Sequence, residues 1–251
     1  MISFTISLIV FACVFGGALL GMCLHAILPQ HHLSNETKDI VKLGMGLVGT
    51  MAALVLGLLV ASAKSSYDTQ SAELTQVAAN VASLDRVLDH YGPESKEIRT
   101  LLRNAVARVV DQTWPKDGAS ASPVAPQSAG GDILYDKVQG LSPKNDAQRS
   151  LQNQALSIAI ETGKMRMLMF AQATAAVSIP LLVVLVLWLT VIFISFGLFA
   201  PFNGTAVASL CVSALSVSAA IFLLLEMYTP YSGVIAISGA PLQAVLGHLG
   251  Q

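Results

Sequence analysis

The chain carries few charged side chains for its 251 residues. Asp, Glu, Lys and Arg make up only 12% of the sequence, which is about half their share in a typical soluble domain. The formal net charge of -1 argues against a nucleic-acid-binding protein, which is usually strongly basic. Hydrophobic residues make up 54% of the chain, so the composition predicts a membrane protein.

Cysteines and catalytic motifs are also scarce. The three cysteines, Cys13, Cys23 and Cys211, lie in apolar segments without metal-site spacing, so we interpret them as packing residues, with a redox or ligand role as the alternative. The sequence has no P-loop, GxSxG or HExxH motif and no paired acidic residues in an apolar stretch. We therefore expect neither an enzyme nor a bound cofactor. His31 and His32 adjoin, but two histidines without a third ligand do not predict a metal site.

The sequence does contain four long apolar segments, each near the roughly 20 residues that a helix needs to cross a bilayer. We expect membrane-spanning helices at about 5–28, 44–63, 177–200 and 205–227. The first segment lacks the basic start of a signal peptide, so we interpret it as a retained anchor, with a cleaved signal as the alternative. Residues 200–204 form so short a link that the last two helices must make an antiparallel hairpin.

Basic residues are concentrated between the second and third apolar segments, where twelve of the fourteen Lys and Arg lie. Near the ends of the spans, Lys64, Lys164 and Arg166 outnumber Lys38 and Lys42, which belong to an expected loop on the opposite side. The positive-inside rule assigns the richer side to the cytoplasm. We therefore predict a multi-pass protein of the inner membrane, with its large domain and both termini in the cytoplasm.

The region at 64–176 is predicted to be a cytoplasmic helical domain inserted between the second and third spans. We expect the helix of the second span to continue into this domain as far as Gly92. Along it, apolar residues recur in a heptad pattern typical of a coiled coil: Leu74, Val77, Val81, Leu84 and Leu88. Further helices are expected from Pro93 to about Trp114 and from Ser142 into the third span, where Pro180 would produce a kink. The fold class is thus an all-α membrane protein, and the small core favours a homo-oligomer.

Two stretches of the expected fold carry breaker residues and no long apolar run. A flexible linker is predicted near 115–131, which is rich in Ala, Ser, Pro and Gly. The tail at 228–251 is broken by Gly239 and Pro241, so we expect it to lie along the membrane interface or to pack on the domain.

The second span has one face of mostly small residues at helical spacing: Gly46, Thr50, Ala53, Gly57, Val60 and Lys64. Small residues allow helices to pack closely, and they also suit a helix that lines a narrow, mostly apolar pore. Both interpretations can hold in a symmetric oligomer, because neighbouring copies of this helix would pack around the axis. Lys64 at the end of the face either belongs to the pore or only anchors the helix at the membrane edge.

A few other ionisable residues are functional candidates, because charge near the membrane is costly. Glu226 at the end of the fourth span is either an interfacial carboxylate or part of an ion pathway. His25 at the end of the first span is most simply an interfacial imidazole, with a functional role as the alternative. Asp85 and Arg86 lie near the end of the long helix, in either a salt-bridged turn or a regulatory site for an ion or ligand.

Several short motifs are spread along the chain: VKLGMGL at 41–47, ALVLGLLVASAK at 53–64, LDR at 84–86, HYGPE at 90–94, FGLFAP at 196–201, GVIAIS at 233–238 and APL at 240–242. Together they resemble the bacterial bestrophin-like membrane family. The resemblance implies a four-helix membrane region with a helical cytoplasmic part, assembled as an oligomeric ion channel around a central axis. Bestrophins proper are anion channels with aromatic residues at the pore neck, and the second span here has none, so the resemblance does not extend to anion selectivity.

The resulting functional hypothesis is an oligomeric ion channel whose second span lines a central pore, with its ion selectivity undetermined. The alternative is a non-conducting membrane scaffold or signalling protein that acts through its cytoplasmic bundle. A transporter fits less well, because four spans are few for alternating access and no inverted repeat is visible. The expected partners are membrane lipid, small ions and further copies of the chain, and not nucleic acid.

Overall fold

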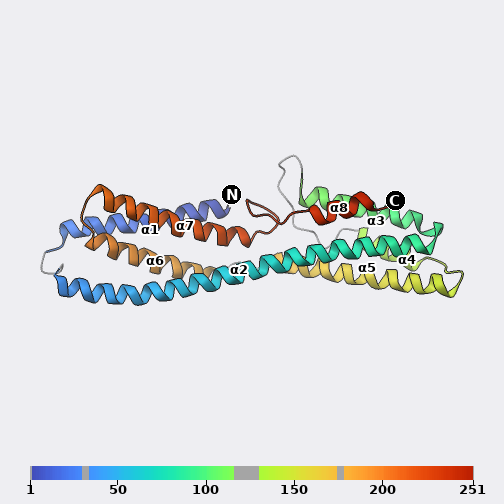
Figure 1. Cartoon of the computed structure of the whole chain (residues 1–251), viewed down its shortest axis with the longest axis horizontal. Helices are drawn as coiled ribbons and strands as arrows, with labels where there is room; N and C mark the ends of the chain where they lie inside the picture. The colour runs from blue at the N-terminus through green and yellow to red at the C-terminus, as the bar shows by residue number, and fades with distance from the viewer. Residues whose placement is uncertain (1, 30–33, 116–129, 174–177, 251) are drawn as a thin grey trace. The chain divides into compact units, whose positions relative to one another are not determined.

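The computed structural model describes residues 2–29, 34–115, 130–173 and 178–250, and every regular element within these ranges is a helix (Figure 1). The chain divides into two compact units, the first formed by Met1–Ser66 and Ala176–Tyr228 and the second by Tyr67–Ala175 and Thr229–Gln251. Each unit has its own hydrophobic core.

The first unit contains the apolar helices, with these bounds: α1 (Ile2–Ile27), the first part of α2 (Asn35–Tyr91), α6 (Ile179–Phe199) and α7 (Gly204–Met227). By length and composition, these four helices of the described chain are able to cross a membrane. The link between α6 and α7 is short, and the side chain of Asn203 caps α7 by accepting a hydrogen bond from the backbone N–H of Ala206 at 2.7 Å.

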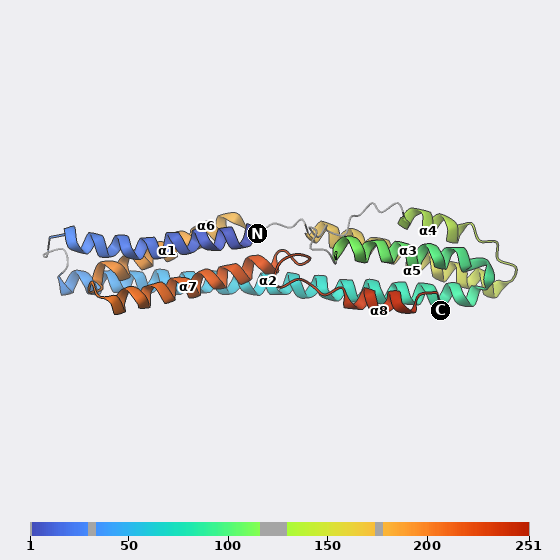
Figure 2. The same ribbon diagram turned by 90° about the horizontal axis from the view of Figure 1, so that it is seen from above.

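Close contact between small residues holds α1 against α6 (Figure 2). A methyl group on Gly21 would collide with the backbone at Ile194, and one on Gly197 would collide with the carbonyl oxygen of Ala18. The two backbones therefore approach as closely as glycine allows. On its other side α1 packs against α7, where the Ser7 hydroxyl donates to the Ser218 carbonyl oxygen at 2.9 Å.

The long helix α2 is a single element of 57 residues. It continues past the predicted second span to Tyr91, and all five residues of the heptad pattern are buried in the core of the second unit. It ends at Gly92, whose φ of 119° is a conformation that favours glycine. Its start differs from the prediction, because the hydroxyl of Ser34 accepts a hydrogen bond from the Thr37 N–H and the helix begins at Asn35, within the expected loop.

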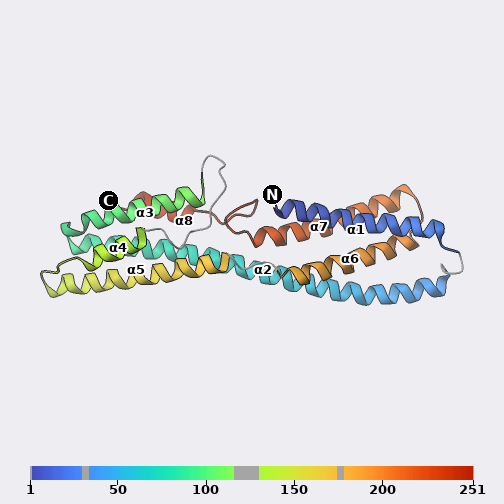
Figure 3. The same ribbon diagram turned by 180° about the vertical axis from the view of Figure 1, so that it is seen from behind.

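The second unit combines the later part of α2 with these elements: the 3-10 turn η2 (Pro93–Ser95), α3 (Lys96–Thr113), α4 (Gly130–Gln139), α5 (Asp146–Ala173) and α8 (Ala240–His248). α4 packs beside α3 and α5 (Figure 3). α5 begins later than predicted from Ser142, because the side chain of Asn145 accepts a hydrogen bond from the Gln148 N–H at 2.8 Å and so caps the helix.

The predicted passage from the domain into the third span as one kinked helix is not what the structure shows. α5 ends at Ala173 and α6 begins at Ile179, and residues 174–177 lie outside the described chain. Pro180 occupies the first turn of α6, where a proline starts a helix without kinking it. Most of the predicted linker, at 116–129, and the pair His31 and His32 also lie outside the described residues.

The tail after α7 packs on the second unit, which is one of the two placements that the sequence left open. The indole N–H of Trp114 donates to the carbonyl oxygen of Ile237 at 2.8 Å. Gly239 lies against the Trp114 ring, where an added methyl carbon would be 2.7 Å from the nearest ring atom. Leu242 and Leu249 of the same segment are buried in the core.

Candidate functional site

The small-residue face of α2 is uncovered in the structure. Each of the six predicted positions, from Gly46 to Lys64, is exposed to solvent in the isolated chain. A methyl group added to Gly46 or Gly57 would meet no atom within 4 Å. No other part of the described chain therefore packs against this face at its two glycines.

The remaining surface of α2 within the first unit has a packed face and a bare apolar face. Ala52, Leu59 and Ala63 are buried and make the contact with the rest of the unit. A second, exposed face carries large apolar side chains: Leu43, Leu47, Leu54 and Leu58. Only 11% of the most apolar stretch of α2 is buried, against 39%, 28% and 22% for α1, α6 and α7, so α2 is the least covered of the four helices.

The small face of α2 forms a nearly uncharged surface, called here a neutral wall. It carries no charged side chain between Gly46 and Val60. The hydroxyl of Thr50 donates to the carbonyl oxygen of Leu47 at 2.8 Å, so its hydrogen is already used within the helix. Lys64 is the first charge along the face, and it has an interaction within the chain. Such a wall has small size and little polarity, which are the properties of a hydrophobic constriction.

The structure places Glu226 and His25 in different surroundings. Glu226 is 4% exposed and lies in α7 beside Leu224 and Leu225 of the core. His25 is exposed, and its Nδ1 donates to the carbonyl oxygen of Leu198 at 2.7 Å, which ties the end of α1 to the end of α6. His25 therefore has a visible structural contact.

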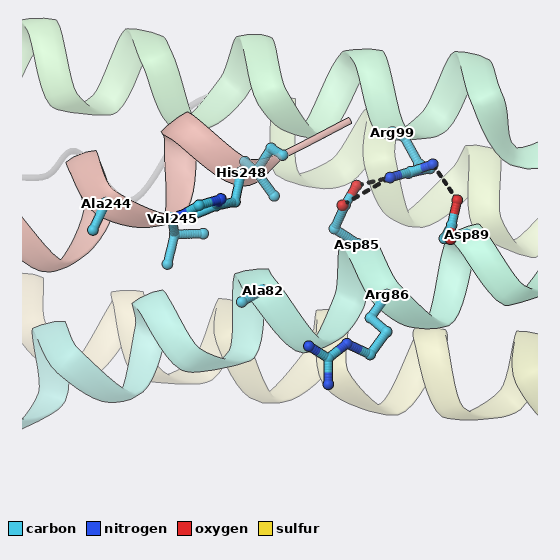
Figure 4. A pocket seen from close by; sticks show the side chains of 9 residues that line it. Ala82, Asp85, Arg86, Asp89, Arg99, Ala244, Val245 and His248 are labelled. Atoms are coloured by element: carbon cyan, nitrogen blue, oxygen red, sulfur yellow. Dashed lines mark hydrogen bonds and ion pairs between the residues drawn. The ribbon is translucent and has the colours of Figure 1, made fainter. Parts of the chain in front are cut away.

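In the second unit, Asp85 belongs to an ion-pair group whose centre the sequence analysis did not single out. Arg99 of α3 donates from Nε to Asp85 Oδ1 at 2.8 Å and from Nη2 to Asp85 Oδ2 at 3.0 Å, and its Nη1 bonds Asp89 (Figure 4). The hydrogen bonds to Asp85, and then the charges of both carboxylates, raise the pKa of the Arg99 guanidinium. The backbone N–H of Gly250 also donates to Asp85, at 3.4 Å, so this group joins α2, α3 and the tail.

Arg86 does not join that group. Its side chain is exposed and points away from Arg99 (Figure 4). It lines a cavity of about 440 Å³ between α2 and α8, together with Ala82, Val245 and His248. The sequence placed Asp85 and Arg86 in one charged cluster, whereas the structure uses the first in an ion pair and leaves the second at the rim of a hollow.

A second hollow, of about 460 Å³, shares Asp89 and Arg99 with the first. It is lined from α3 by Lys96, Thr100, Arg103 and Asn104, and from the tail by Gly250. At the same end of the unit, Lys144 pairs with Glu94 at 2.5 Å, and this bond lowers the pKa of the Glu94 carboxyl. Within the described residues, no three His, Cys, Asp or Glu side chains gather in a way that could hold a metal ion.

Comparison with known proteins identifies the family and the fold. The bestrophin-like domain family matches residues 12–242. The fold matches the crystal structure of a bacterial bestrophin homologue from Klebsiella pneumoniae that carries a point mutation, with a TM-score of 0.62 and 14% sequence identity. The match covers 94% of this chain and 96% of that one. No curated protein sequence matches the chain. The family match over most of the sequence, together with the four apolar helices, shows that the chain is an integral membrane protein that belongs to the bestrophin-like family.

Proposed function

We propose that the protein is an oligomeric ion channel in which α2 lines a central pore. The observation that carries the proposal is the small-residue face of α2, which the rest of the described chain leaves bare. A bare face of this kind suits both close packing between helices and the wall of a narrow pore. A ring of copies around an axis satisfies both needs at once, and membership of the bestrophin-like family supports this arrangement.

The packing of the other spans supports the choice of α2. α1 is held between α6 and α7 by close contacts, and the buried share of its most apolar stretch, 39%, is the largest among the four helices. α2 has its bare leucine face next to its small face, and the leucine face offers a surface for lipid or for a neighbouring copy. The small face is then free to border the axis, and its neutral wall favours control of ion flow by wetting and drying.

The decisive experiment measures conductance of the purified protein in planar bilayers and compares two glycine-to-leucine variants of α2. Gly57→Leu places a bulky group on the small face and should strongly reduce single-channel conductance. Gly44→Leu adds the same group at a position that is also exposed and also has no atom within 4 Å, but lies on another side of the helix. It should leave the conductance close to that of the unchanged protein.

Two results would contradict the proposal. A reconstituted protein that stays silent in bilayers and in liposome flux assays would exclude conduction, and recovery of a bound partner protein by crosslinking would then favour the scaffold alternative. Equal losses of conductance in Gly57→Leu and Gly44→Leu would remove the small face from the pore.

We further propose that the second unit and both ends of the chain lie in the cytoplasm of a cell with an inner membrane. The support is the surplus of basic residues at Lys64, Lys164 and Arg166 over Lys38 and Lys42. In a background without the native cysteines, Ser142→Cys should be protected from an impermeant thiol reagent in intact spheroplasts, and Asn35→Cys should react. The reverse labelling pattern would show an inverted topology.

A further inference from the structure

The second hollow of the helical unit, of about 460 Å³, carries an excess of positive charge. Its charged lining consists of three basic side chains, Lys96, Arg99 and Arg103, and one carboxylate, Asp89. Three positive charges and one negative charge leave a formal charge of +2 on the lining, and Asp85, which also pairs with Arg99, reduces the excess to +1, in a chain whose net charge is -1. The hollow is therefore a local concentration of positive charge on a nearly neutral protein.

The basic side chains of this hollow differ in how their charges are balanced. Arg99 is paired with Asp85 and Asp89, so its charge is already neutralised within the chain. The side chains of Lys96 and Arg103 form no hydrogen bond or ion pair with any part of the chain that the structure describes. The excess charge thus resides on two side chains that are exposed and available.

The arrangement of these residues on α3 suits a ligand. Lys96, Arg103 and their polar neighbours Thr100 and Asn104 recur at helical spacing and line the hollow from one face of the helix. The face presents two positive charges and two neutral polar side chains to the same hollow, which suits an anion. The Asn104 amide adds N–H groups that can donate to the oxygens of such an anion.

We propose that this hollow binds a small soluble anion that carries a phosphoryl group. Lys96 and Arg103, the two cations without a carboxylate partner, together match the charge of a phosphoryl dianion. The planar guanidinium of Arg103 can donate hydrogen bonds to two of its oxygens. The volume falls within the usual range for small-molecule sites, which leaves room for more than a single phosphate. The ligand would contact α3 and the tail together, because Gly250 lines the same hollow.

The test is isothermal titration of the purified full-length protein in detergent, with pyrophosphate as the probe. We expect saturable binding that weakens as sodium chloride is added. Lys96→Gln and Arg103→Gln should each lower the affinity by roughly tenfold or more, because each removes a charged donor. Arg108→Gln removes the same charge from the same helix at an exposed position outside the hollow, and should leave the affinity unchanged.

A parallel titration with a short-chain phosphatidylglycerol distinguishes a soluble ligand from a lipid headgroup. Binding of pyrophosphate with little binding of the lipid supports the proposal as stated. If only the lipid binds, and this binding is lost in Arg103→Gln, the site recognises a lipid headgroup and the proposal of a soluble ligand is wrong. Absence of saturable binding by either probe, or an equal loss of affinity in Arg108→Gln, overturns the site itself. The measurement does not depend on conduction, so it succeeds or fails separately from the channel proposal.

Discussion

Gly21 and Gly197 lie where α1 meets α6, and neither position has room for a methyl group. Gly16 lies in the same helix as Gly21, yet a methyl group there would meet no atom within 4 Å. Because glycine without a close neighbour only weakens a helix, the two positions should respond oppositely to alanine.

We predict that Gly21→Ala destabilises the protein by about 1–3 kcal/mol, because the two helix backbones must separate. Gly16→Ala should be neutral or should stabilise the helix by up to about 1 kcal/mol. Thermal unfolding in detergent, followed by tryptophan fluorescence, measures both. A melting temperature for Gly21→Ala equal to that of Gly16→Ala would show that α1 and α6 are not in close contact.

Tyr231 is a second residue whose surroundings give a measurable property. Its hydroxyl is buried without a hydrogen-bond partner among the described residues, and its ring meets Trp114 edge to face at a centroid distance of 6.3 Å. Burial, and to a smaller extent the charge of Glu73, raises the pKa of Tyr231 to about 12 from the ordinary value of 10. Between these two pH values the unfolded chain loses a proton that the folded chain keeps.

The stability supplied by protonated Tyr231 should therefore be complete below pH 10 and decline as the pH rises towards about 12. The loss should amount to no more than about 3 kcal/mol. An absorbance titration of tyrosinate should show a late-titrating group that is missing in Tyr231→Phe. The variant should also lose less stability between pH 9 and pH 11 than the unchanged protein does. Identical titration curves would contradict the buried position.

At the scale of elements, the apolar helices and the continuation of α2 into the second unit were predictable from sequence. Long apolar runs have few other stable forms in a membrane, and the heptad pattern from Leu74 to Leu88 has a strong helical period. The small-residue face of α2 followed from the same helical period, whereas its exposure in the isolated chain did not. Helix starts were predicted less well, because a cap depends on which of several polar residues bonds the backbone, as Asn145 does for α5.

The contacts between elements were not predictable in the same way. Small residues occur on both α1 and α2, and the pattern alone does not say that the α1 glycines face α6 while the α2 glycines stay bare. Arg99 lies fourteen residues after Asp85, so their pairing depends on the turn at Gly92 that folds α3 back on α2. A charge pattern within one helix contains no information about that turn.

The tail provides a prediction at this scale, because one glycine allows it to lie on α3. Gly239→Ala would press a methyl group into the Trp114 ring and should loosen the segment that contains α8. We expect faster hydrogen exchange at the amide of Ile237, which donates to the carbonyl oxygen of Pro230 at 2.7 Å. Gly247→Ala in α8 is the matched control, since an added methyl group there meets nothing within 4 Å. Unchanged exchange in Gly239→Ala would mean that the tail does not need this contact.

At the scale of the whole molecule, the chain separates two kinds of chemistry into two units. The first unit has apolar helices, a neutral small face and a single core. The second holds the ion pairs of Arg99 and the two hollows beside it. The channel proposal rests on the first unit and the anion site on the second, so the two can be tested on the same purified protein with separate variants.

From Met167 onwards, the sequence contains only one residue among Asp, Glu, Lys and Arg, which is Glu226. The hairpin of α6 and α7 therefore carries no basic residue that could direct its orientation during membrane insertion. In the proposed topology, its direction is set by the earlier spans and by Lys164 and Arg166 near the end of α5. In the proposed topology, the correct placement of α8 therefore depends on residues that precede the hairpin.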